Sequence, residues 1–506
     1  MKRVKSAFKW LIPAAALLLV LAGCQPVSGL DVNKVLLGSS DVQSSESSLN
    51  VSMNMKPSAA ATEEDKEIID LINSFSLKLD DIKAQDSSTL SASGELDSSK
   101  LNIPFQLSIN KDAMAVKVEG AKEPFYLPLT VDGSLGSSAG SGLGLDPDKS
   151  LALSKEIQSF LVNHLPNPSV INVSKVNETV HGEQLSLTKL HAEISGDELT
   201  GLLKTFLQSV SDDHDGLKAL VSGLYDNLLP VLKEQGITSL KDLDSSFGDV
   251  SLNDKDAAVT EVYTKLQQAL DLVVLSYDKV VNQALEEEPD AAALLSTGTK
   301  LSTDIYVDGD YKARKQNVEV SISLPDMGEE LPLSSLGFKV ESEQWNVNGA
   351  VQADLLDTAN AIDITDETLT PGTILRNFDP QSEIYGVLKN DLGITQKYIT
   401  IDPEYDDTIV KQNTTMIPLR YLAEYLDATV KTQDGKIVVT DDLSSGQLIF
   451  TPGSPYAAIN GSVVKLPQPV FIDKYGRAYA PLRVLAEGLQ AHVGKDSDGS
   501  YYVTRD

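Results

Sequence analysis

The thiol of Cys24 is the side chain whose chemistry can be assigned most directly from its neighbours. Cys24 is the only cysteine among 506 residues, so no disulfide can form within the chain. It follows an apolar run from 10 to 20, and a basic segment precedes that run. The run is too short to span a bilayer, which needs about 20 apolar residues. A basic segment followed by a short apolar one is typical of a secretory signal peptide. The basic residues are Lys2, Arg3, Lys5 and Lys9.

The residues that end the apolar run predict a lipidation site. Ala22 and Gly23 are small enough for the pocket of a signal peptidase, and a cysteine thiolate is a nucleophile. The sequence from Leu21 to Cys24, L-A-G-C, resembles the lipobox of bacterial lipoproteins. The resemblance implies cleavage between Gly23 and Cys24. It also implies that lipid on Cys24 holds the protein on the extracytoplasmic face of the cell membrane. The alternative is an ordinary signal peptide followed by a chance cysteine.

Two N-terminal segments follow from this interpretation. Residues 1–23 are the predicted lipoprotein signal peptide. Residues 24–48 contain three pairs of adjacent serines, a composition that favours a flexible linker. We therefore expect 24–48 to be a lipidated tether.

Residue types suited to metal binding are not grouped elsewhere in the chain. The histidines are scattered, at positions 164, 181, 191, 214 and 492, without the spacing of converging ligands. There is no phosphate-binding Walker loop and no H-E-x-x-H motif. The segment from Asp496 to Gly499 is similar to part of a calcium loop. Gly494 and Arg505 would then occupy the first and twelfth positions, which contradicts the EF-hand pattern. The sequence predicts no metal, no cofactor and no enzymatic activity.

A repeat near the C-terminus is the most specific internal signal. Residues 416–430, MIPLRYLAEYLDATV, recur as residues 479–493, YAPLRVLAEGLQAHV. Pro418 and Pro481 suit the first turn of a helix, and the residue before a proline favours extended backbone. Leucines and alanines then recur at helical spacing, and each copy continues to an Asp-Gly turn of the kind that joins two strands. The pattern predicts a strand–helix–hairpin unit used twice over 396–506.

The core P-L-R-x-L-A-E-x-L, present in both copies, resembles the copper amine oxidase N-terminal-like domain. That domain is a stalk-type module common in exported proteins of Gram-positive bacteria. The resemblance covers 396–506 and does not imply oxidase chemistry. An oxidase would also need a tyrosine in an Asn-Tyr context and a His-x-His pair of copper ligands, and the chain has neither.

Side chains of the repeat region predict a binding surface. Aromatic residues with polar tips are frequent in binding surfaces, and arginines can contact a ligand. The alternatives are that the arginines form surface pairs with glutamates four residues later, and that the tyrosines are ordinary strand residues. The candidates are Arg420, Arg483, Tyr421, Tyr425, Tyr456, Tyr475 and Tyr479, with Tyr501 and Tyr502 adding to the aromatic surplus.

The region before the repeat predicts an α+β domain over 49–350. Apolar residues alternate from Leu49 to Met55 and again from Ile103 to Ile109, which indicates strands with one buried face. Helical periodicity follows over 149–290, with a strand-like interruption, and alternation returns from Leu301. We expect an antiparallel sheet covered by helices. This order weakly resembles the half-barrel of envelope proteins that carry lipids or lipoproteins. Residues 351–395 are the expected connector.

Composition limits the partners. The formal net charge is −31, which disfavours nucleic acid as a partner. The leading hypothesis is a non-enzymatic, lipid-anchored protein that binds or scaffolds at the cell wall, its partner a wall polymer or an envelope protein. The alternative is a carrier of an apolar ligand in the N-terminal half-barrel. The third is an unrecognised envelope hydrolase.

Overall fold

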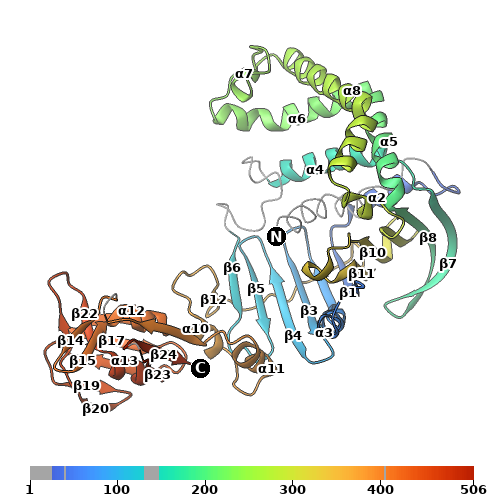
Figure 1. The fold of residues 1–506 in the computed structure, drawn as a ribbon. Coiled ribbons are helices and arrows are strands. Elements are labelled where there is room, and N and C mark those ends of the chain that lie inside the picture. Colours follow the sequence, from blue (N-terminus) through green and yellow to red (C-terminus); the bar gives the residue numbers. More distant parts are fainter. Residues whose placement is uncertain (1–25, 39–40, 130–146, 404–405, 498) are drawn as a thin grey trace. The chain divides into compact units, whose positions relative to one another are not determined.

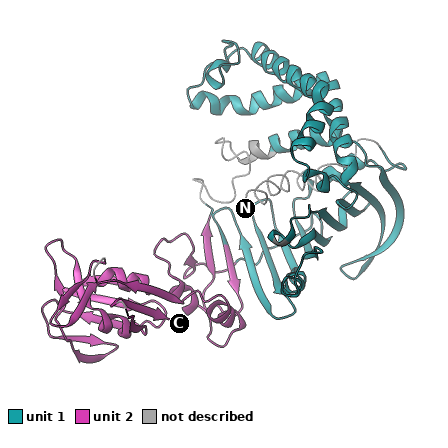
Figure 2. Cartoon of the chain, in the orientation of Figure 1, with its two compact units in different colours: residues 1–114, 129–355 teal, residues 115–128, 356–506 magenta. Residues whose placement is uncertain are grey.

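The computed structural model describes residues 26–38, 41–129, 147–403, 406–497 and 499–506 (Figure 1). The fold mixes helices with antiparallel sheets, which confirms the predicted α+β class. The chain divides into two compact units, one of residues 1–114 and 129–355 and the other of residues 115–128 and 356–506 (Figure 2). No helix in the described ranges is long and apolar enough to cross a membrane.

The first unit is built on an antiparallel sheet in the order β4-β3-β2-β1-β11-β10-β9-β8-β7. The sheet joins strands from both ends of this unit, because β1 pairs with β11. Its strands are β1 (Ser45–Pro57), β2 (Ser76–Ala84), β3 (Leu90–Asp97), β4 (Asn102–Ile109), β7 (Val170–Val180), β8 (Glu183–Ser195), β9 (Lys300–Val307), β10 (Ala313–Ser323) and β11 (Leu333–Trp345).

Register places an apolar row on one face of this sheet. Val51 lies opposite Val340 on one side and Leu77 on the other, and Leu77 lies opposite Leu96. Residues opposite each other in an antiparallel pair share a face, so the alternation seen in the sequence becomes one continuous apolar surface. The row runs Val318, Val340, Val51, Leu77, Leu96 and Ile103.

Helices cover this sheet where it contains β8, β9 and β10. Val162 of α4 and Leu199 of α5 are buried in one cluster with Ile194 and Leu301 of the sheet. The predicted helix-covered sheet is therefore confirmed for these strands. The helices of this unit are α2 (Val32–Gly38), α3 (Glu63–Asn73), α4 (Pro147–His164), α5 (Leu199–Asp212), α6 (His214–Glu234), α7 (Leu240–Leu243), α8 (Lys255–Glu287) and α9 (Ala291–Leu294) (Figure 1).

The predicted tether over 24–48 is wrong for the part that the structure describes. Val32 and Val35 of α2 are buried against Leu190 and Ile305 of the sheet, and β1 already begins at Ser45. The serine pairs suggested a linker. The few apolar residues of α2 did not by themselves predict a helix, because the residues that they pack against are distant in the sequence. Helix α3 was also not predicted. It begins at a capping box, in which Thr62 and Asp65 satisfy each other's backbone N–H groups.

The predicted connector over 351–395 is not a linker, because its residues 356–395 pack as part of the second unit. Leu375 and Phe378 are buried, and Phe378 contacts Phe125 with ring centroids 5.8 Å apart. The side chain of Asn377 donates to the carbonyl of Glu123 at 2.8 Å. These segments are β5 (Ala113–Val118), β6 (Phe125–Pro128), β12 (Ile362–Asp363), α10 (Pro371–Arg376) and α11 (Glu383–Gly386). The unit boundary falls within β5.

The repeat forms two strand–helix–hairpin copies, as predicted. The first copy is β15 (Thr414–Pro418), α12 (Leu419–Tyr425), β16 (Ala428–Gln433) and β17 (Lys436–Asp441). The second is β22 (Ala478–Pro481), α13 (Leu482–Gly488), β23 (His492–Lys495) and β24 (Tyr501–Arg505). Other strands are β13 (Lys397–Ile401), β14 (Ile409–Lys411), β18 (Gln447–Phe450), β19 (Tyr456–Ile459), β20 (Ser462–Lys465) and β21 (Phe471–Ile472).

The two copies share one core. β15 pairs with β22 so that Met416 faces Pro481 and Pro418 faces Tyr479, an exchange of equivalent positions. Leu422 of α12 and Leu485 of α13 are both fully buried in a single apolar cluster. The apolar core of this region is therefore formed by residues of both copies together.

Candidate functional site: an aromatic sheet face and a buried polar network

Strand alternation produces an exposed aromatic face on the sheet β13-β24-β23. Ile399 and Val503 point into the shared core. Tyr398 and Tyr502, one residue away on the same strands, therefore point to the other side. Their rings lie nearly parallel, with centroids 6.5 Å apart. The ring of His492 lies 6.3 Å from that of Tyr502.

The neighbours of these rings hold them in place. The hydroxyl of Tyr425, at the end of α12, donates to the carbonyl of Tyr398 at 2.5 Å. Gly494 lies opposite Tyr502 on β23, and a Cβ there would overlap with Cζ of the Tyr502 ring. A glycine is thus needed for Tyr502 to lie across the strand. We call Tyr398, Tyr425, His492 and Tyr502 the tyrosine face.

Hydroxyl groups surround the tyrosine face. By register, Thr504 lies opposite both Tyr398 and His492, and Thr400 lies opposite Tyr502, so both threonines share this side of the sheet. The exposed fractions are 62% for Tyr398 and 37% for Tyr425. The surface offers flat apolar rings beside hydroxyl donors and acceptors, which suits a ligand that has both apolar faces and hydroxyl groups.

The tyrosines predicted from the sequence do not gather in one place. Tyr425 belongs to the tyrosine face, and Tyr421 lies one turn earlier on the same helix. Tyr475 is 72% exposed and lies instead over Arg477, whose guanidinium carbon is 5.6 Å from the ring centroid. Tyr456 is exposed on β19, and Tyr501 packs against the shared core.

Tyr479 is not a surface residue, so its prediction was wrong. It is 1% exposed, stacks on Phe471 with ring centroids 5.2 Å apart and donates to Asp407 at 3.1 Å. Burial raises the pKa of its phenol. Its strand, β22, lies between β15 and β21, so the side chain is covered from both sides.

The two predicted arginines form surface pairs with glutamate, the structural alternative considered above. Arg420 lies 2.7 Å from Glu424, and Arg483 lies 3.6 Å from Glu487. Arg483 also donates to the carbonyl of Val493 at 3.3 Å.

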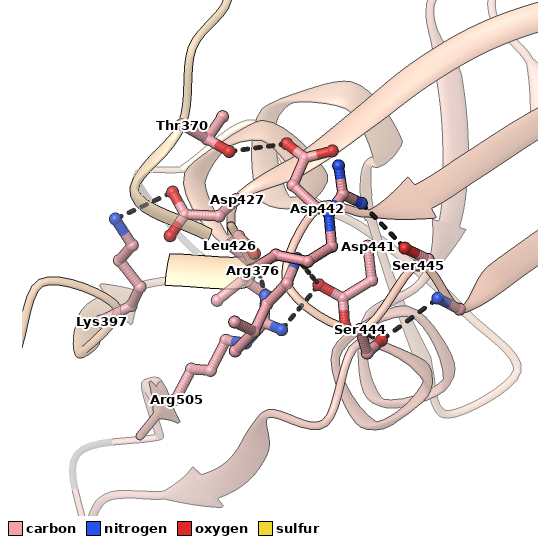
Figure 3. A network of polar contacts seen from close by, with 12 residues as sticks. Thr370, Arg376, Lys397, Leu426, Asp427, Asp441, Asp442, Ser444, Ser445 and Arg505 are labelled. Atoms are coloured by element: carbon pink, nitrogen blue, oxygen red, sulfur yellow. Dashed lines mark hydrogen bonds and ion pairs between the residues drawn. The ribbon is translucent and has the colours of Figure 1, made fainter. Parts of the chain in front are cut away.

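A network of buried charges lies in the same unit (Figure 3). Asp441 and Arg505 end the equivalent strands β17 and β24, and their side chains pair at 2.7 Å with 1% and 3% exposed. Asp442 accepts from Thr370 and from Thr429, each at 2.9 Å. The first pair joins the two copies of the repeat. The second group joins the start of α10 to the repeat.

Lys397 and Asp427 complete the network. Lys397 Nζ lies 3.0 Å from Asp427 Oδ1. Burial raises the pKa of Asp427, and the hydrogen bond from Lys397 opposes that effect. Asp427 follows α12 with a positive φ of 53°, which directs the chain from the helix into β16.

Sequence reasoning missed Tyr398 and His492. The signal was present in residues 397–401, KYITI, where Tyr and Thr alternate with two isoleucines. Gly23 and Cys24, the predicted cleavage and lipidation positions, lie outside the described residues. Within the described residues, no three His, Cys, Asp or Glu side chains form a group that could hold a metal ion.

Comparison with known proteins finds a similarity in the C-terminal region. No curated protein matches this chain. Residues 398–503 match the family model described as the copper amine oxidase N-terminal domain, and the match spans both copies of the repeat with the strand β13 that completes them. Residues 398–503 of this chain are therefore similar to the copper amine oxidase N-terminal domain.

Proposed function

We propose that this protein is a non-enzymatic, lipid-anchored protein of the cell envelope that binds a wall polysaccharide through its C-terminal domain. The tyrosine face is the observation that carries the proposal. Sugar rings have apolar C–H faces and polar hydroxyl edges, and tyrosine offers a rigid apolar ring with a polar tip at low entropic cost. The sheet places two such rings nearly parallel, beside threonine hydroxyls.

Charge favours a neutral polysaccharide over an anionic polymer. The formal net charge of −31 repels phosphate-rich chains at long range. The tyrosine face itself consists of uncharged phenols, hydroxyls and one imidazole. The match to the copper amine oxidase N-terminal domain fits a non-catalytic, stalk-like domain.

We expect Tyr398→Ala combined with Tyr502→Ala to weaken binding to purified cell wall by more than tenfold. Aromatic residues at the centre of an interface contribute about 2 kcal/mol or more each. The measurement is co-sedimentation of the full chain with wall polysaccharide over a range of protein concentrations. Tyr475→Ala is the matched control, because Tyr475 is equally aromatic and more exposed but lies over Arg477. Equal binding by the double variant and the unsubstituted protein would exclude the tyrosine face as the binding surface.

A second candidate function, a carrier of an apolar ligand, is favoured by the apolar row in the first unit. Side chains of this row on β1 to β4 remain partly exposed, and Leu96 reaches 36%. In contrast, Ile194 and Leu301 in the helix-covered part of the sheet are buried. A partly covered apolar surface in a sheet fits an acyl chain.

For the carrier, we expect lipid extracted from the purified protein to be lost in Leu77→Glu, because a carboxylate in the row would oppose an acyl chain. Lys78→Ala, on the opposite face of the same strand, should retain the lipid. Mass spectrometry of solvent extracts from the native protein measures the bound molecules. If both variants and the unsubstituted protein carry no stoichiometric lipid, the carrier function is rejected.

A further inference from the structure

Among the described residues, the pair of Lys397 and Asp427 differs from the other lysine–carboxylate pairs in the burial of its carboxylate. Lys397 begins β13, and Asp427 follows α12, so the contact joins segments that are distant in the sequence. The exposed fractions of the two side chains are 19% and 5%. Figure 3 shows the Lys397 amine at one oxygen of the Asp427 carboxylate, with the other oxygen turned away.

Burial of the carboxylate is the unusual feature. In the other lysine–carboxylate pairs of the described residues, the carboxylate side chain is at least 23% exposed, the value for Asp304 with Lys189. Asp427 Oδ2 is buried and has no hydrogen-bond partner among the described residues. A buried carboxylate oxygen without a partner is energetically costly, and this cost is removed if that oxygen leaves.

We propose that Lys397 and Asp427 condense to an intramolecular amide that links β13 to the end of α12. A proton first passes from Nζ to the carboxylate across the 3.0 Å contact. The lone pair of the neutral amine then forms a bond to Cγ, and the bond between Cγ and Oδ2 breaks. Of the three protons initially on Nζ, one remains on the amide nitrogen and two leave with Oδ2 as water. No oxidant, reductant or further reactant is needed.

The surroundings of the pair favour two requirements of this reaction, a neutral carboxyl group and contact between the reacting groups. A carboxyl group must be neutral to react with an amine, and burial raises the pKa of Asp427 toward that form, with Asp442 acting in the same direction and Lys397 and Arg505 opposing it. The fold holds the reacting groups in contact, which removes the entropic cost of bringing them together. The linkage does not depend on wall binding, so its test is independent of the test of the proposed function.

Peptide mapping of the purified full chain tests the proposal. Trypsin should fail to cut after Lys397. Residues 390–411 should appear joined to residues 421–431 in a species one water lighter than the two linear peptides combined. Fragmentation of that species should place the bond between Lys397 and Asp427. Recovery of Asp427 unmodified in the linear peptide 421–431, with trypsin cutting normally after Lys397, would overturn the proposal.

Lys397→Arg supplies the matched variant, because a guanidinium keeps the positive charge but does not form the amide. Its map should contain three linear peptides, 390–397, 398–411 and 421–431, and no joined species. Lys189→Arg is the control, since Lys189 pairs with the more exposed Asp304, and it should leave the joined species unchanged. A joined species that persists in Lys397→Arg would assign the linkage to another residue and would also overturn the proposal. The map of the unsubstituted protein decides the matter even if Lys397→Arg folds poorly.

Discussion

Replacement of Leu422 by Asp is expected to unfold both copies of the repeat, although the substitution lies in only one. Leu422 and its equivalent, Leu485, are fully buried in the same cluster, and β15 pairs with β22 between the copies. Each copy alone offers too few residues to bury an adequate core. If the apolar face of α12 no longer packs in the core, the apolar face of α13 is therefore exposed to water as well.

The expected destabilisation is comparable to the whole stability of a domain. Placing a carboxylate at a fully buried apolar position costs several kcal/mol, whereas domains are stable by about 5–15 kcal/mol. The pair of Asp441 and Arg505 adds a buried contact between the two copies, at 2.7 Å.

Hydrogen exchange of the full chain measures this effect in both copies at once. We expect peptides covering 414–441 and 478–505 to lose protection together in Leu422→Asp. Arg420→Ala, on the exposed side of the same helix, should leave both sets of peptides protected. Protection that is lost in the first copy and retained in the second would show that the copies fold independently, and the single-core interpretation would then be abandoned.

Replacement of Cys24 by Ala is expected to release the protein from the membrane. A diacylglyceryl group carries two acyl chains, each contributing about 0.8 kcal/mol per buried methylene group, which is enough for stable anchoring. Alanine has no thiol to accept that group. No helix in the described part of the chain is long and apolar enough to cross a membrane.

Membrane fractionation and the mass of the N-terminal peptide check this expectation. The unsubstituted protein should sediment with membranes, carry lipid on Cys24 and accumulate uncleaved when globomycin inhibits the lipoprotein signal peptidase. The Cys24→Ala protein should carry no lipid and should leave the membrane fraction. Ser28→Ala is the control, because it changes a nearby residue and leaves the thiol of Cys24 in place. Unchanged membrane retention and an unchanged N-terminal mass in Cys24→Ala would exclude lipidation at this residue.

Local features of the fold were predictable because they depend on neighbours in the sequence. The spacing of Leu419, Leu422 and Leu426 is sufficient to define an amphipathic helix. The recurrence of P-L-R-x-L-A-E-x-L is sufficient to define the repeat and the family resemblance. Alternation between Leu49 and Met55 predicted a strand. In each case the periodicity of one segment fixes its type and shows which residues share a side.

Residue type and period did not show which side each segment would bury, because that depends on distant partners. Tyr479 and Tyr502 are both strand tyrosines, yet β22 lies between two strands that cover Tyr479, whereas Tyr502 lies across Gly494 on an open face. The sequence around Val32 predicted a tether, whereas in the structure Val32 is buried against residues of β8 and β9. The sequence by itself therefore determined the repeat and the elements with a clear apolar period, but not α2 or α3. Only the tertiary structure decided which tyrosines face solvent and that Lys397 meets Asp427, since both follow from long-range contacts that the period of a single segment does not contain.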